Sequence, residues 1–545
     1  MIKKPFKKIR NKAFFHYFVL AIILIFATYL RFNNLNWDQG LTLHPDERNI
    51  IAAVTRLSWP KKINPEFYAY NGFPLFLIDI SSQLVSKLTN NPSYLNDWGK
   101  ISFIARFHSA LFSLFSVYLF YLISKLVFNK KIALISAFLA ATTVGFIQHA
   151  HYGVTESLLV LELLGLTYLS IKFLKTKNQK FFLLMAIVLG ISIGTKTSAL
   201  SFALIPFISV LMIHKLKLKT LIKFFIFLVF TFLVFFIVSP NTIIYFDEFL
   251  TSMNYERAVV NGKQTIFYTM QFIDTIPYLF QIRNLVWLSS PILVFTAGWG
   301  IYLLLKNRKR YLVIWPFLIY SLVYFIYIGS WYAKFNRYLL PFIPVMILLA
   351  SLTINHLKNH KFYKLILIIL LLVNGVWSLS FLKIFRKEHT RITASNWIEK
   401  NIADQSTILV EEWDERLPKT TGSSISYQHR TLKLYQLDNM EKFKTLTSQL
   451  AEGDYLIIAS RRLYKSIPRS PNHPHTKQYY KLLFEEQLGY KQVAQFNSYP
   501  NFLGIEIKDD GIEETFRVFD HPTIIVFENF EKLSSEEIFN KIFKN

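Results

Sequence analysis

The feature that most constrains this chain is a series of long apolar segments within its first 381 residues. A helix that spans a membrane needs about 20 mostly apolar residues. Eleven segments come close to this length or exceed it: residues 13–30, 101–127, 132–149, 155–174, 181–195, 199–213, 221–238, 285–305, 311–328, 337–354 and 362–381. The number changes by one if the short break at Gly194–Lys196 does not separate two spans. The sequence therefore predicts an α-helical polytopic membrane protein with about eleven transmembrane helices.

The composition agrees with a membrane protein and excludes some chemistry. Hydrophobic residues make up 52% of the chain, which is more than an ordinary soluble protein contains. Cysteine is absent, so disulfides, thiolate catalysis and Cys-based metal sites are excluded. A net charge of +26 could indicate binding to nucleic acid. It has a simpler explanation if the lysines and arginines are concentrated in the cytoplasmic loops of a membrane protein.

The cations do follow the membrane topology, because alternate loops differ in their content of lysine and arginine. With a cytoplasmic N-terminus, the short outer turns contain Lys196, Lys334 and Arg337. The inner loops contain Lys130, Lys131, Lys175, Lys177, Lys180, Lys215, Lys217, Lys219, Lys306, Arg308, Lys309, Arg310, Lys358 and Lys361. The positive-inside rule then predicts a multi-pass protein of the plasma (inner) membrane with its N-terminus in the cytoplasm. The first span lacks a small-residue cleavage site and is predicted to be an uncleaved signal anchor.

The chain is predicted to form two domains. Residues 1–381 would form a transmembrane catalytic domain with two long outer loops, 31–100 and 239–284. Beyond residue 382, helix-like segments such as TRITASNWIEKNI alternate with β-branched runs such as STILVEEW. This alternation predicts a small α/β domain over residues 382–545, on the extracytoplasmic side.

The sequence HPDE, residues 44–47, places two carboxylates on the outer side directly after the first span. One interpretation is a helix N-terminus, with Pro45 in the first helical position and Asp46 and Glu47 in the first turn. The other is a catalytic carboxylate at the outer face of the membrane. The residues alone leave both interpretations open.

A second polar group occurs in QHAHYGVTESLL, between the third and fourth predicted spans. His149, His151 and Glu156 are zinc-ligand types, as is His44. Their spacing matches no established zinc motif, and Glu156 also suits the first turn of a helix. The sequence identifies no certain cofactor, and a divalent metal ion is left open, with His44, His151 and Glu156 as weak candidate ligands. Glu162 is expected to be an internal hydrogen-bonding group.

Three cations are candidates for binding a phosphate. Lys196 and Arg337 lie on short outer turns, where the positive-inside rule disfavours them, and Arg106 lies near the outer end of the second span. Interfacial snorkelling is the alternative explanation for each. An arginine grips a phosphate bidentately and a lysine acts as a point charge, so the three predict a donor phosphate-binding set.

These stretches resemble a known family. The outer-loop Asp-Glu pair, HYGVTESLL, GTKTSALSF and FNRYLLPFIP are similar, in that order, to the GT-C-type integral membrane glycosyltransferases. The nearest branch is the family 39 protein O-mannosyltransferase and aminoarabinose-transferase group, and TASNWIEKNI, VEEWDERLP and VFDHPTIIVF extend the similarity into the outer domain. The resemblance implies a polyprenyl-phosphate-linked sugar donor, an acceptor protein, lipid or glycan, and inversion at the anomeric carbon.

The resemblance also implies roles for individual residues. Asp46 matches the catalytic base, with Glu47 as its partner, and Glu156 matches an acidic position that is Asp in many members. Lys196 and Arg337 match cations that engage the lipid-phosphate donor. The chemistry is consistent, because an attacking hydroxyl needs a base and a departing phosphate needs cations. A double displacement would instead use a second carboxylate about 5 Å from the first.

Two other classes of function remain as alternatives. A transporter or flippase of lipid-linked glycans would have many helices and intramembrane charges, although such proteins usually show paired halves with interrupted helices. A metallohydrolase would use the histidines and acids of the outer side. Consumption of a polyprenyl-phosphate sugar by purified protein would separate the first from a glycosyltransferase, and sensitivity to chelators would identify the second.

Overall fold

The computed structural model of the protein describes residues 3–214, 217–419 and 425–544, and it divides into two compact units. The first, here called the membrane unit, consists of Met1–Glu256, Pro277–Ser330 and Asn336–Leu382. The second, the sheet unit, consists of Arg257–Ile276, Trp331–Phe335 and Lys383–Asn545. Two short segments from within the first 381 residues thus group with the C-terminal part of the chain.

The membrane unit is helical, and within the described residues seven helical segments are long and apolar enough to span a membrane. A further pair, α5 and α6, passes the same test but is bent by 56°. The long segments are formed by α1 (Lys3–Phe32), α4 (Trp98–Val127), α7 (Glu156–Thr176), η2 with α9 (Thr197–Ala203 and Leu204–His214), α10 (Leu218–Val238), η4 with α15 (Arg308–Ile314 and Trp315–Gly329) and α17 (Tyr363–Arg386).

Three shorter apolar helices occur in the same unit: α8 (Gln179–Thr195), α14 (Pro291–Lys306) and α16 (Ile343–Leu357). The predicted polytopic helical fold is confirmed, whereas the number of eleven spans stays a prediction. Only 17% of the most apolar window of α10 is buried, although its hydropathy is the highest of these segments. An unburied surface of that composition is suited to lipid.

A buried arginine explains how the bend between α5 (Lys130–Ala141) and α6 (Val144–Ala150) is tolerated. A helix break leaves backbone carbonyl groups without intrahelical partners, which is costly away from water. The Arg31 guanidinium donates to the carbonyl oxygens of Ala140 and Ala141 at 3.0 and 2.9 Å, and to Ser113 Oγ at 2.8 Å. Arg31 therefore ties α1 and α4 to the bend that begins α6.

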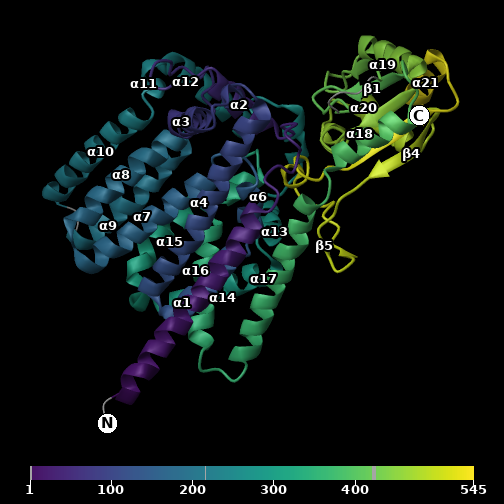
Figure 1. Ribbon diagram of the computed structural model, residues 1–545. Coiled ribbons are helices and arrows are strands. Elements are labelled where there is room, and N and C mark those ends of the chain that lie inside the picture. The colour runs from purple at the N-terminus through teal and green to yellow at the C-terminus, as the bar shows by residue number, and fades with distance from the viewer. Residues whose placement is uncertain (1–2, 215–216, 420–424, 545) are drawn as a thin grey trace. The chain divides into compact units, whose positions relative to one another are not determined.

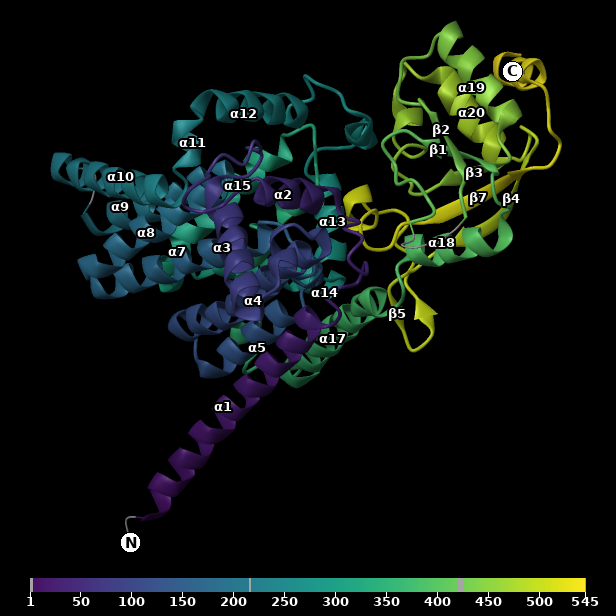
Figure 2. The same ribbon diagram turned by 45° about the horizontal axis from the view of Figure 1, so that its top comes forward.

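The predicted long outer loops contain short helices. The first holds α2 (Pro45–Thr55), α3 (Gly72–Thr89) and η1 (Pro92–Leu95), and the second holds α11 (Asn241–Ile244) and α12 (Phe246–Val260). The helices η3 (Phe267–Phe272), α13 (Leu279–Leu288) and η5 (Asn336–Leu339) follow along the chain. Figures 1 and 2 show α2, α11 and α12 at the end of the membrane unit opposite the free end of α1.

The sheet unit contains a five-stranded sheet in the order β2-β1-β3-β7-β4. Strand β1 (Thr407–Glu411) pairs in parallel with β2 (Gln428–Leu432) and β3 (Tyr455–Ile458). Strand β7 (Ile524–Asn529) is antiparallel to β3 and to β4 (Tyr490–Phe496). A separate small hairpin is formed by β5 (Asn501–Phe502) and β6 (Ile505–Glu506).

Helices cover both faces of this sheet. Successive apolar side chains of β1 point to opposite faces, so that each face has apolar residues for a helix to cover. Ile408 and Val410 join one cluster with residues of α18 (Thr390–Asn401), and Leu409 joins the other. Helices α19 (Met440–Glu452), α20 (Pro474–Phe484) and α21 (Ser535–Phe543) supply that second cluster. Figure 2 shows α18 on one face and α19 and α20 on the other. The small C-terminal α/β fold predicted from the sequence is confirmed.

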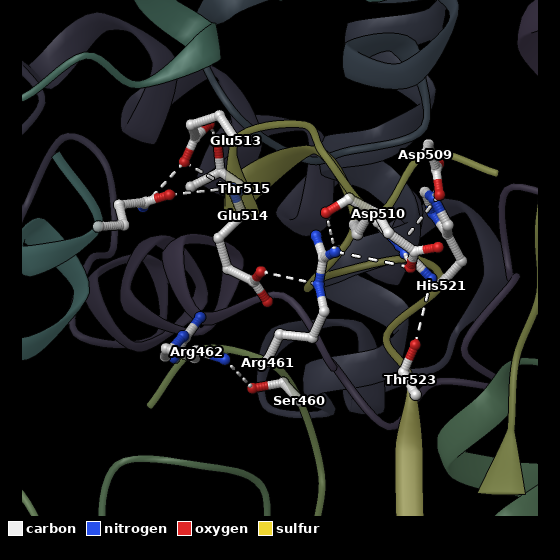
Figure 3. A network of polar contacts seen from close by, with 12 residues as sticks. Ser460, Arg461, Arg462, Asp509, Asp510, Glu513, Glu514, Thr515, His521 and Thr523 are labelled. Carbon is white, nitrogen blue, oxygen red and sulfur yellow. Dashed lines mark hydrogen bonds and ion pairs between the residues drawn. The ribbon is translucent and has the colours of Figure 1, made fainter. Parts of the chain in front are cut away.

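A network of ion pairs connects the end of β3 to the segment that precedes β7 (Figure 3). Arg461 lies 3.2 Å from Glu514, and Arg517 lies 3.2 Å from Asp509, which also contacts His521 Nε2 at 2.8 Å. Arg461 and Arg517 thus form buried ion pairs with Glu514 and Asp509, and His521 contacts the Asp509 carboxylate. We interpret this network as structural: it fixes the segment between β6 and β7 to the sheet.

Candidate active site

The HPDE sequence forms the start of α2. His44 is the N-cap residue and its Nδ1 accepts a hydrogen bond from the Asp46 N–H at 3.2 Å, while Pro45 is in the first helical turn. The carboxylates of Asp46 and Glu47 are in that turn, where the helix dipole favours negative charge. Since successive residues of a helix point about 100° apart, the two side chains diverge. The backbone therefore confirms the helix-cap interpretation, and the side chains of Asp46 and Glu47 have different partners.

Asp46 forms an ion pair with Arg337 of η5, across 291 residues of sequence. The Asp46 side chain keeps 28% of its surface exposed and Arg337 keeps 29%. Burial raises the pKa of the Asp46 carboxyl, but Arg337, His44 and Lys196 together outweigh it, so the pKa is lowered. Asp46 is thus a carboxylate that is ionised at neutral pH and remains accessible from water.

Glu156 forms the second ion pair of the site. It is the first residue of α7, and its Oε1 accepts from Lys196 Nζ at 3.1 Å. The Glu156 side chain is 4% exposed and the Lys196 side chain is 19% exposed. The ammonium group also lies 5.0 Å from the centre of the Tyr70 ring, a cation–π contact.

The two ion pairs act on one another and form one group, which we call the charged cluster: Asp46, Glu156, Lys196 and Arg337. Lys196 contributes to the lowered pKa of Asp46. Burial raises the pKa of the Tyr70 hydroxyl, and the negative charges of Asp46 and Glu156 raise it further. The structure thus brings together four of the residues that the sequence singles out, from four separate segments. Two carboxylates balance two cations.

Arg106 and Glu47 belong to a different, fully buried group. Arg106 Nη2 lies 2.7 Å from Asp38 Oδ2 and 2.6 Å from Glu47 Oε2, and all three side chains are at most 1% exposed. Glu47 also accepts from Ser102 Oγ at 3.1 Å and from the Gly153 N–H at 2.6 Å. The carboxylates and the Leu35 carbonyl engage every nitrogen of the Arg106 guanidinium.

This placement separates two of the predicted site residues from the charged cluster, and their predicted roles stay predictions. Arg106 is not placed with Lys196 and Arg337 as part of a phosphate-binding set, because its hydrogen-bond donors are occupied by protein groups. Glu47 is held in a buried ion pair with Arg106. Both residues instead fix the start of α2 to α4, and so determine where Asp46 lies.

The histidines do not assemble into a metal site. Both ring nitrogens of His151 lie at hydrogen-bonding distance from carbonyl oxygens, 2.8 Å from Ile147 and 3.0 Å from Asn33. His149 Nδ1 lies 3.0 Å from the Gly145 carbonyl. Within residues 3–214, 217–419 and 425–544, no group of three or more His, Asp or Glu residues could hold a metal ion. The weak candidate set of His44, His151 and Glu156 therefore does not fit a metal.

Three residues that no sequence motif marks are also buried beside these groups: Asp38, Tyr70 and Asn71. Asp38 pairs with Arg106, Tyr70 contacts Lys196, and Asn71 donates to the carbonyl of Ile193 at 2.6 Å. An Asn-Gly pair such as Asn71–Gly72 indicates a turn, which is the only signal the sequence offers at this place.

Comparison with known proteins identifies a related family for part of the chain. Residues 98–244 match a family model described as dolichyl-phosphate-mannose-protein mannosyltransferase. The matched segment contains Glu156 and Lys196, whereas Asp46 and Arg337 lie outside it. No curated protein sequence matches the chain.

Solved structures match over nearly the whole length. The archaeal oligosaccharyltransferase AglB of Archaeoglobus fulgidus, in complex with an inhibitory peptide and a dolichol-phosphate, has a TM-score of 0.52 at 14% identity. The match covers 92% of this chain and 75% of AglB. An A. fulgidus oligosaccharyltransferase tethered to an acceptor peptide has a TM-score of 0.51 at 12% identity, over 95% of this chain and 88% of the other. ArnT from Cupriavidus metallidurans has a TM-score of 0.47 at 11% identity, over 96% and 99%.

Proposed function

Because the chain has the fold of the GT-C-type membrane glycosyltransferases, we propose that it transfers a sugar from a polyprenyl-phosphate-linked donor to an acceptor hydroxyl. The transfer takes place at the outer face of the membrane and inverts the anomeric carbon. The charged cluster carries this proposal, because it combines an accessible carboxylate with two cations that suit a phosphate.

The cations serve the donor. A sugar joined to a polyprenol through phosphate carries one negative charge, and cleavage of the bond between the anomeric carbon and the phosphate oxygen adds a second. Arg337 and Lys196 stabilise that added charge, and such stabilisation in a preorganised site accelerates the reaction. Before the donor binds, Asp46 and Glu156 hold the same cations in place. The donor phosphate then replaces a carboxylate as the partner of each cation.

Asp46 serves the acceptor. As the acceptor oxygen forms its bond to the anomeric carbon, its proton passes to the Asp46 carboxylate, while the electrons of the broken bond remain on the departing phosphate. Asp46 suits this role better than Glu156, because an acceptor arriving from water can reach a carboxylate that is 28% exposed more easily than one that is 4% exposed. Glu156 holds Lys196 in place before the donor binds, and a single displacement inverts the configuration.

The experiment that tests this proposal uses purified full-length protein with polyprenyl-phosphate sugars whose sugar is radiolabelled. We expect transfer of label to water-soluble or lipid acceptors and release of free polyprenyl phosphate. A flippase or other transporter would move the labelled lipid across a proteoliposome membrane and leave the donor bond intact, which would overturn the proposal.

Removing the Arg337 guanidinium should weaken carrier binding. Loss of one charge-assisted contact costs about 1.5–3 kcal/mol, so Arg337→Ala should bind polyprenyl phosphate roughly 10- to 150-fold more weakly. Arg337→Lys should lose less, because it keeps the charge and loses only the two-pronged geometry. Arg308→Ala, which removes an exposed arginine of a predicted inner loop, is the matched control. If Arg337→Ala, Arg337→Lys and Arg308→Ala all bind polyprenyl phosphate as wild type does, Arg337 does not bind the phosphate and is an interfacial anchor.

We also infer the orientation of the chain, with its N-terminus in the cytoplasm and the sheet unit outside. The distribution of loop cations supports it. Reporter fusions at Lys177 and Asn307 should report the cytoplasm, and a fusion at Glu412 should report the outside. A cytoplasmic signal at Glu412 would contradict this orientation.

A further inference from the structure

Lys196 occupies a break in a helical segment. Helix α8 ends at Thr195, Lys196 has an extended backbone with φ of −156° and ψ of 135°, and η2 begins at Thr197. Such a break frees backbone carbonyl groups, and in a membrane these must find partners within the protein. The groups that bind them therefore set the shape of the break and the position of the lysine.

Asn71 supplies those partners. Its N–H donates to the Thr195 carbonyl at 3.2 Å, and its side-chain Nδ2 donates to the Ile193 carbonyl at 2.6 Å. The same Nδ2 lies 3.3 Å from Thr197 Oγ1. Asn71 is 1% exposed, so these contacts are shielded from water. One buried residue thus binds the chain on both sides of Lys196.

The neighbours of Asn71 hold it in place. The Gly72 N–H donates to Ser239 Oγ at 2.7 Å, and a Cβ atom on Gly72 would lie 2.1 Å from Asn241 Oδ1. A side chain at position 72 would therefore force the segment away from the end of α10. Tyr70, on the other side of Asn71, places its ring 5.0 Å from the Lys196 ammonium.

The opposite side of the break is also bound. Thr195 Oγ1 donates to Glu162 Oε1 at 2.7 Å, and Glu162 is 6% exposed. The break is thus held from two directions, by Asn71 from the first outer loop and by Glu162 from α7. The ammonium of Lys196 is left to reach Glu156.

We propose that Asn71 is a positioning residue for the donor phosphate: it shapes the break in the helix so that Lys196 presents its charge to the charged cluster. This inference rests on the proposed function, since it assumes that Lys196 binds the donor phosphate. Asn71 itself touches neither donor nor acceptor, and it acts through Lys196.

The test measures binding of polyprenyl phosphate, without a sugar, to purified full-length protein in detergent. Lys196→Ala should weaken binding roughly 10- to 150-fold, and Asn71→Ala should weaken it about tenfold. Asn71→Asp keeps the size of the side chain but turns an oxygen toward the Ile193 carbonyl, so it should weaken binding at least as much. In the Asn71→Ala/Lys196→Ala double variant, the Asn71 change should cost nothing further, because its effect passes through the lysine.

Two controls separate positioning from general damage. Asn91→Ala removes an asparagine of the same outer loop whose side chain holds a local turn with Ser93, and it should bind as wild type does. Uncharged polyprenol, which lacks the phosphate, should bind Asn71→Ala and wild type equally. Misfolded protein would lose affinity for both polyprenyl phosphate and polyprenol. If Asn71→Ala and Asn71→Asp both lose affinity for both lipids, Asn71 does not specifically position the phosphate-binding lysine.

The outcomes distinguish this inference from the function on which it rests. If Lys196→Ala binds polyprenyl phosphate like wild type, the phosphate role of Lys196 fails, and the inference fails with it. If Lys196→Ala binds weakly but Asn71→Ala does not, only the inference fails. Additive losses in the double variant would show that Asn71 acts by a route other than Lys196.

Discussion

Asp46→Asn protein should transfer sugar about 10²–10⁴-fold more slowly than wild type while still binding polyprenyl phosphate. The substitution keeps the shape of the side chain and removes the group that receives the acceptor proton. It also removes the negative charge that competes with phosphate for Arg337. We therefore expect affinity for the carrier to stay the same or to increase while turnover falls.

Loss of turnover with retained carrier binding identifies a catalytic role, because a misfolded variant would lose both turnover and binding. Turnover is measured as the release of polyprenyl phosphate from the sugar donor, and binding is measured with the sugar-free carrier. Asp97→Asn is a matched control, since Asp97 caps α4 through the Lys100 N–H and asparagine caps a helix equally well. Wild-type turnover in Asp46→Asn together with an inactive Glu156→Gln variant would assign the base to Glu156.

The second large effect is on stability. Glu47→Gln removes one charge from the buried group of Glu47, Arg106 and Asp38, in which every side chain is at most 1% exposed. Arg106 keeps Asp38 as its partner, but it loses the charge-assisted hydrogen bonds that it donates to Glu47, so the substitution should cost about 1.5–3 kcal/mol. The midpoint of thermal unfolding in detergent should fall accordingly.

An exposed pair in the same outer loop provides the comparison. Arg56 and Glu66 lie 3.4 Å apart with 39% and 59% of their side chains exposed, and such a pair contributes roughly 0–1 kcal/mol. Glu66→Gln should therefore unfold at nearly the wild-type temperature. If Glu47→Gln has the wild-type midpoint of thermal unfolding but has lost turnover, Glu47 takes part in the reaction, and the structural role assigned to it here is contradicted.

The elements that the sequence predicted well are those governed by local pattern. The apolar segments of the membrane unit and strand β1, within STILVEEW, have a hydrophobic content that decides their structure. Strand β2, with the sequence QHRTL, was not predicted, because it is an edge strand with few buried residues and its pattern resembles a loop. Its structure depends on pairing with β1, which the local sequence does not encode.

For the candidate site too, the sequence indicates which residue types could function there, but not which distant residues they contact. Arg106 and Arg337 looked equivalent in the sequence, since each is an arginine near the outer end of a predicted span. Their difference arises from partners far away in the chain: two buried carboxylates for Arg106 and one accessible carboxylate for Arg337. No local pattern marks Tyr70 or Asn71 either, because their importance depends on contacts with residues more than 120 positions later. The catalytic and phosphate-binding roles stay predictions.

The contacts of Arg31 have a consequence for the order in which the protein is made. Its carbonyl partners outside α1, Ala140 and Ala141, follow it by 109 and 110 residues. At typical rates of synthesis, about 5–20 residues per second, the ribosome needs roughly 5–20 s to produce them. During that interval α1 is already available for insertion, while the partners of Arg31 outside α1 do not yet exist. The first helix must therefore keep Arg31 near water, or beside other proteins of the insertion machinery, until the chain that will enclose it has been translated.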